Sequence, residues 1–165
     1  MRNPKSSHEV HCDAETFWKI FLDEEYNRTL IMEELQFKSR EVLEATDTVR
    51  RMKIVPKMNM PKPVVKLLGD SFGYEESGKL DREKNEWTWT MQPNKLQGKL
   101  MTSGSVHIEP IGDDKCRRTD QACIEAKVFG VGKLIESSTE KEVLAAWRIE
   151  ERFFKRWLEK RASSA

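Results

Sequence analysis

Several segments within residues 37–129 alternate apolar and polar side chains with a period of two. Successive side chains of a strand point to opposite faces, so this period predicts antiparallel strands with one buried face and one solvated face. A lone sheet of this kind must cover its apolar face with another layer of structure. The fold therefore depends on which part of the chain provides that cover.

We expect six strands in this region. The predicted ranges are 37–45, 48–56, 71–80, 86–91, 98–112 and 115–129, with the first hairpin turning at 45–48. Glycine-rich and aspartate-rich segments separate the later strands, as turns require. A further short strand is predicted near the N-terminus, at 6–12.

Helical periodicity flanks the strands. Residues 14–35 are predicted to be helical, with Asp13 as the N-cap and a break near Asp23. From 132 to 161 the apolar residues return to a helical period, and Thr139 with Glu142 predicts a capping box that restarts this helix. The predicted apolar stripe consists of Leu134, Ile135, Ala146, Ile149, Phe153 and Trp157.

Only the last helix is long enough to cover the sheet. The sequence therefore predicts an α+β fold in which a curved antiparallel sheet wraps around a long C-terminal helix. A chain of 165 residues is of the size of one domain, so we expect a single domain over 1–165 with its core at about 7–160. A domain of this size has room for a core and for an internal cavity.

Composition excludes several classes of protein. Lys and Arg number 29 against 28 Asp and Glu, whereas a generic nucleic-acid binder has a basic excess, so we expect no nucleic-acid partner. The basic doublets 50–51 and 117–118 are expected on solvated strands. No apolar run reaches 18 residues, which predicts no membrane span. Three cysteines without C-x-x-C spacing favour a reducing compartment such as the cytoplasm, with an organelle and a removed targeting peptide left open.

The element order and four sequence segments resemble a known family. The segments are DAETFWKIFLDEEYNRTL at 13–30, MPKPVVKLLGDSFGYEESGKLDREKNEWTWTM at 60–91, GKLMTSGSVHIEP at 98–110 and GVGKLIESSTEKEVLAAWRIEERFFKRWL at 130–158. Over roughly residues 7–160 the chain resembles the START-like superfamily, also called Bet v 1-like or SRPBCC, and within it the DUF2505 family. The resemblance implies the helix-grip fold, with a deep apolar cavity between the sheet and the C-terminal helix. It carries no catalytic residue over to this chain.

The inward face of the predicted sheet gives the candidate ligand-binding residues. Trp87 and Trp89 share one face of their strand and either fill the core or line a pocket. The apolar candidates are Met52, Ile54, Tyr74, Trp87, Trp89, Val106, Ile124, Ile149 and Phe153. Four charged residues share the inward parity and are predicted either to form structural ion pairs near the cavity mouth or to orient a polar head group. They are Arg50, Glu76, Arg118 and Asp120.

Other motifs give no catalytic, metal or cofactor site. His8 and His11 point to opposite faces if they lie on a strand, so they do not predict a metal site. The glycines before Lys133 lack the spacing of a phosphate-binding loop. We therefore expect no metal and no cofactor.

The leading hypothesis is binding, and transfer, of a lipid or other apolar small molecule. An enzyme of the polyketide cyclase or aromatase kind would use the same cavity, and a chaperone-associated protein-binding module would instead fill it. Residues 56–73 are predicted to contain a short helix at one end of the sheet. That segment is either a static crossover or a gate, whose Lys57, Lys62 and Lys66 would meet anionic lipid transiently at a membrane surface.

Overall fold

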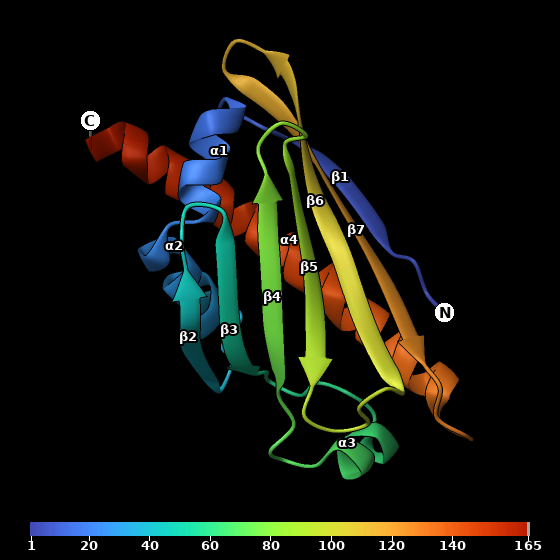
Figure 1. Ribbon diagram of the computed structural model, residues 1–165. Coiled ribbons are helices and arrows are strands. Elements are labelled where there is room, and N and C mark those ends of the chain that lie inside the picture. The colour runs from blue at the N-terminus through green and yellow to red at the C-terminus, as the bar shows by residue number, and fades with distance from the viewer. Residues whose placement is uncertain (165) are drawn as a thin grey trace.

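The structure is a computed structural model that describes residues 1–164, and its elements form one sheet and the helices around it (Figure 1). The strands are β1 (Lys5–Val10), β2 (Ser39–Ala45), β3 (Val49–Val55), β4 (Tyr74–Asp81), β5 (Glu86–Pro93), β6 (Leu100–Gly112) and β7 (Lys115–Ala126). The helices are α1 (Ala14–Phe21), α2 (Glu24–Thr29), α3 (Lys62–Leu68) and α4 (Gly132–Ser164), and a π-helical turn, η1 (Leu30–Glu34), follows α2. The predicted α+β class is confirmed.

The sheet is antiparallel throughout, in the order β1-β7-β6-β5-β4-β3-β2. Figure 1 shows α4 crossing behind the sheet, with α1 and α2 beside its C-terminal half. The helix α3 lies at the other end, near the connection from β7 to α4 (Figure 1). We call this end, made of residues 56–73, 94–99 and 127–133, the α3 end.

Local capping explains where the first helices begin. The carboxylate of Asp13 accepts a hydrogen bond from the Thr16 amide at 2.7 Å, and that of Asp23 accepts one from the Tyr26 amide at 2.9 Å. Each carboxylate satisfies an amide that has no partner within its helix. The predicted cap at Asp13 and the predicted break near Asp23 are both confirmed.

An aromatic cluster joins the N-terminal helices to α4. The ring of Tyr26 stacks on Phe153 with centroids 5.1 Å apart, and Phe17 stacks on Phe154 at 5.0 Å. Trp157 meets both Tyr26 and Phe153 edge-on. Such pairs stabilise a fold beyond the area they bury. Phe153 is therefore anchored against α2, whereas we had predicted that it faces the sheet.

The helix α4 differs from its predicted form in two ways. It runs without interruption over 33 residues, so the capping box at Thr139 and Glu142 does not form. Ile135 and Val143 lie on the same apolar face, one before and one after Thr139. The apolar pattern therefore continues through the predicted restart, and the helix does too. Leu134 was predicted in the buried stripe but is exposed, because its neighbour Ile135 occupies the inward position. None of the helices in residues 1–164 is both long and apolar enough to cross a membrane.

The predicted short helix in residues 56–73 is α3. Pro63 lies in its first turn, and Gly69 ends it with a φ of 81°, a conformation that glycine adopts without strain. Val64 and Leu68 are fully buried and pack with Phe72 and Ile135. One face of α3 therefore belongs to the core at the α3 end.

We expect the substitution Phe153→Ala to lower the free energy of unfolding by about 3–5 kcal/mol, because the ring is buried between Tyr26 and Trp157. Urea denaturation measures this loss. Phe129→Ala is the matched control, since Phe129 is fully exposed and its removal should change stability by less than about 0.5 kcal/mol. Equal effects of the two substitutions would contradict the packing described for α4.

Candidate functional site

A cavity lies between the inward face of the sheet and α4, toward the α3 end. Its outer chamber has a volume of about 360 Å³ and is bounded by α4, η1, α3 and the segment 56–60. The apolar wall is formed by Leu35, Phe37, Met58, Met60, Leu68, Phe72, Tyr74, Met91, Leu100, Ile135, Val143, Ala146 and Ile149. Burial raises the pKa of Glu142, an acidic residue on this wall. The chamber offers a mostly apolar surface with few polar groups, as small-molecule sites do.

An inner chamber of about 160 Å³ adjoins the outer one, deeper toward α1 and α2. The two chambers share six wall residues, namely Leu35, Phe37, Tyr74, Met91, Val143 and Ala146. The inner wall differs in chemistry because it combines aromatic rings with charged side chains. Its polar residues are Asn27, Arg50, Glu76, Arg118, Asp120 and Glu150.

Most of the predicted site residues line this cavity. Met52, Ile54, Tyr74, Trp87, Trp89 and Val106 lie on the inner wall, and Ile149 lies on the outer wall. Ile124 and Phe153 are buried but border neither chamber. Phe153 packs on α2, as described above, and Ile124 lies on β7 opposite Thr102. Whether the lining residues bind a ligand stays a prediction.

The four predicted charged residues all line the inner chamber, and Arg50, Arg118 and Asp120 are buried. Each belongs to a strand, on which only alternate residues face inward. The basic doublets are therefore split: Arg50 and Arg118 are buried, whereas Arg51 and Arg117 point outward. The expectation that both doublets lie wholly on solvated surfaces was wrong for the inward member of each.

Two carboxylates bind the guanidinium of Arg118. Its guanidinium donates two hydrogen bonds of 2.8 Å to Asp120 and one of 2.9 Å to Glu150 of α4. Burial alone would lower the pKa of Arg118, but the charges of Asp120 and Glu150 outweigh it and raise the pKa well above its usual value. This network ties β7 to α4 with charged hydrogen bonds inside the fold.

Arg50 is bound differently. Its Nη1 donates to the backbone oxygen of Phe21 at 3.0 Å and to Oδ1 of Asn27 at 2.8 Å, and the guanidinium lies over the rings of Phe21 and Trp87. Its Nη2 is 3.8 Å from Glu76, too far for a hydrogen bond. Burial lowers the pKa of Arg50 and raises that of the Glu76 carboxyl. Arg50 and Glu76 are therefore neighbours that form no direct hydrogen bond.

Glu150 was not among the predicted residues, although the sequence contains the signal for it. It lies four residues after Ala146 and three before Phe153, so it shares the face of the predicted stripe. Two glycines were also missed. Gly78 and Gly104 lie beside the indoles of Trp87 and Trp89, where a Cβ atom would collide with the rings. Trp89 is in cross-strand register with both glycines, which was the available signal.

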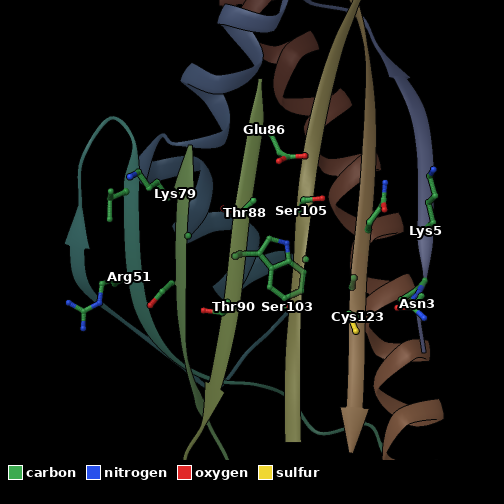
Figure 2. Close-up of a pocket in the computed structure, with 18 residues that line it drawn as sticks. Asn3, Lys5, Arg51, Lys79, Glu86, Thr88, Thr90, Ser103, Ser105 and Cys123 are labelled. Carbon is green, nitrogen blue, oxygen red and sulfur yellow. The ribbon is translucent and has the colours of Figure 1, made fainter. Parts of the chain in front are cut away.

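A second, more open recess lies on the opposite face of the sheet. It has a volume of about 840 Å³, and Figure 2 shows it in front of the strands, with α4 behind them. Short polar side chains such as Thr88, Thr90, Ser103 and Ser105 line its floor, with Lys5, Lys79 and Arg51 toward its sides (Figure 2). This recess is open to solvent, so it does not offer the enclosure that an apolar ligand needs.

The family model described as "Protein of unknown function (DUF2505)" matches residues 5–158. No curated protein matches the sequence. This match agrees with the predicted resemblance, which covered almost the same residues.

Several solved structures share the fold. The Zhui aromatase/cyclase from Streptomyces sp. R1128 superposes with a TM-score of 0.68 at 10% identity, over 95% of each chain. Norcoclaurine synthase from Thalictrum flavum, in complex with dopamine and hydroxybenzaldehyde, gives 0.67 at 19% identity, over 96% of this chain and 87% of that one. A START superfamily protein from Mycobacterium smegmatis gives 0.61 at 15% identity, over 96% and 97%. The START-like, helix-grip fold is thereby confirmed, while function has to be argued from the site.

We expect Arg118→Met to destabilise the fold by about 3–5 kcal/mol, because it leaves Asp120 buried without its partner. Arg117→Met is the control on the same strand, since Arg117 is exposed and its ion pairs with Glu9 and Glu109 should contribute at most about 1 kcal/mol. Thermal and urea unfolding measure both. An Arg118→Met protein as stable as the control would show that the network is not structural.

Proposed function

The chain belongs to the DUF2505 family, and we propose that it reversibly binds an apolar small molecule in the cavity between its sheet and α4. The observation that carries this proposal is the outer chamber, a space of about 360 Å³ with a mostly apolar wall. Apolar area removed from water is the main source of affinity for such a ligand. The methionines Met58, Met60 and Met91 on this wall suit ligands of varied shape.

A saturable blue shift in the emission of the neutral dye Nile red should accompany binding to the wild-type protein. Ala146→Trp should abolish the shift, because Ala146 borders both chambers and a tryptophan there would fill the space between them. Lys141→Trp is the control on the exposed side of α4 and should bind as wild type. Unchanged binding by a folded Ala146→Trp protein would place the dye elsewhere. Native mass spectrometry of freshly purified protein would add the mass of any retained ligand.

A second candidate function is catalysis of the cyclase type, as the name of one structural neighbour indicates for that neighbour. It is favoured by the carboxyl of Glu76, which lies near Tyr74 on the cavity wall and has a raised pKa because of burial. A carboxyl in such a setting suits proton transfer near neutral pH. Binding remains the stronger proposal because it requires only the apolar chamber.

We further propose that the ligand is exchanged at an anionic lipid surface, which the α3 end contacts. The three segments of this end contain seven exposed lysines and one acidic residue, Asp70, in a chain whose formal charge is only +1. The lysines are Lys57, Lys62, Lys66, Lys95, Lys99, Lys127 and Lys133. Each basic residue near an anionic membrane contributes about 1 kcal/mol to binding.

Exposed apolar side chains accompany these lysines. Phe129 is 104% exposed at the connection from β7 to α4, and Leu67 of α3 and Leu134 of α4 are also exposed. Val128 and Val131 pack in the same apolar cluster as Val64 and Leu68 of α3, so the two segments are neighbours. An aromatic ring beside basic side chains is the usual composition of a membrane-contacting surface. The mouth of the cavity adjoins this surface, since Met58 and Met60 line the outer chamber.

We expect the protein to co-sediment with phosphatidylcholine vesicles that contain about 30% phosphatidylserine and to release them as salt is raised. The double substitution Lys66→Gln/Lys133→Gln should weaken vesicle binding about tenfold or more, and Phe129→Ala should weaken it further. Lys155→Gln/Lys160→Gln, at the far end of α4, removes the same charge and should have little effect. Equal losses from the two double variants would leave only a nonspecific charge effect.

A further inference from the structure

Three polar groups on the cavity wall have unused hydrogen-bonding capacity. In residues 1–164, the Glu76 carboxyl and the Tyr74 hydroxyl make no hydrogen bond, and neither Nη2 nor Nε of Arg50 has an acceptor. Arg50 is 92% buried, with 8% of its surface exposed. Of these atoms, Nε of Arg50 is buried without a partner, and an unpaired buried donor costs free energy. Glu76 and Tyr74 are half-buried, so together with Arg50 they offer free donors and acceptors to a group that enters the cavity.

Arg50 and Glu76 lack the direct hydrogen bonds that Arg118 makes to its neighbouring carboxylates. Arg118 closes on Asp120 and Glu150 at 2.8–2.9 Å, whereas Nη2 of Arg50 and Oε1 of Glu76 stay 3.8 Å apart. A hydroxyl oxygen beside this gap can lie about 2.8–3.0 Å from both, accepting from Arg50 and donating to Glu76. The gap has the dimensions of one bridging hydroxyl.

The three groups also lie in a row along the cavity. Gly78, Glu76 and Tyr74 are successive inward positions of β4, and their partners on β3 are Arg50, Met52 and Ile54. Tyr74 borders both chambers, while Glu76 and Arg50 border only the inner one. A ligand with its tail in the outer chamber would therefore direct its head past Tyr74 to Glu76 and Arg50.

We propose that the inner chamber selects an uncharged amphiphile whose hydroxyl head bridges Arg50 and Glu76. This inference rests on the proposed binding function and names the class of ligand: a long-chain or polycyclic alcohol. A ligand carboxylate is disfavoured, because three carboxylates (Glu76, Asp120 and Glu150) already face two arginines in the inner chamber. An ammonium head is disfavoured as well, because it would displace Glu76 from its partner and lie beside Arg50.

Titration calorimetry with 1-decanol, decanoate and decylamine tests the selection, since the three share one tail. At pH 8, which favours the ionised form of Glu76, decanol should bind about tenfold or more tightly than either charged analogue, as expected for lost hydrogen bonds to charged groups. Equal affinities for all three would overturn the inference and leave the proposed function intact. Binding of none of them, together with no response to Nile red, would overturn the proposed function itself.

Glu76→Gln should reverse the order of affinities. The substitution removes the negative charge beside Arg50, so decanoate should bind about tenfold more tightly than to the wild type, while decanol weakens. Glu75→Gln is the control on the same strand, because Glu75 points outward and pairs with Arg51. It should leave all three affinities unchanged. If Glu76→Gln does not fold, the head-group series on the wild-type protein still decides the question.

Discussion

The fold depends on one geometric constraint: a single helix covers the inward face of a seven-stranded sheet. A helix with its side chains is about 10–12 Å wide, whereas neighbouring strands are about 4.8 Å apart, so one helix cannot fill the space across seven strands. The N-terminal helices supply the missing volume at one end, through the aromatic cluster of Phe17, Tyr26 and Phe154. At the α3 end the filling is incomplete, and the cavity remains there.

The charged residues of the inner chamber follow from the same arrangement. Arg118 and Glu150 connect β7 to α4 next to the aromatic cluster, and this network fixes the helix over the sheet. Buried ion pairs are seldom a net source of stability compared with apolar packing, but they restrict how elements fit together. Within this group Arg118 makes three hydrogen bonds to carboxylates, whereas Arg50 and Glu76 make none to each other and retain capacity for a further partner. We therefore assign the structural hypothesis to Arg118 and Asp120, and the ligand-directed role of Arg50 and Glu76 stays a proposal.

The sequence predicted the elements well because their signals are local. Strand alternation, the cap at Asp13, the break near Asp23 and the proline at the start of α3 each depend on residues a few positions apart. Parity also predicted correctly that Arg50, Glu76, Arg118 and Asp120 face inward. The errors concern which neighbours a residue meets and whether a helix is interrupted. Periodicity gives the face of an element but not its neighbour, so it could not tell that Phe153 meets α2.

The α3 end contains the residues proposed to contact a membrane and, beside them, the residues that line the outer chamber. Val64 and Leu68 hold α3 in the core, while Leu67 and Lys66 on the same short helix face outward. The preceding residues, Met58 and Met60, form part of the outer chamber. A lipid surface that contacts α3 and Phe129 therefore lies beside the entrance, and an alcohol head can travel from that surface to Arg50 and Glu76 without crossing the aromatic core. The two proposals thus treat entry at this end and head-group selection in the inner chamber as separate steps, consistent with a mostly apolar outer wall and polar groups on the inner wall.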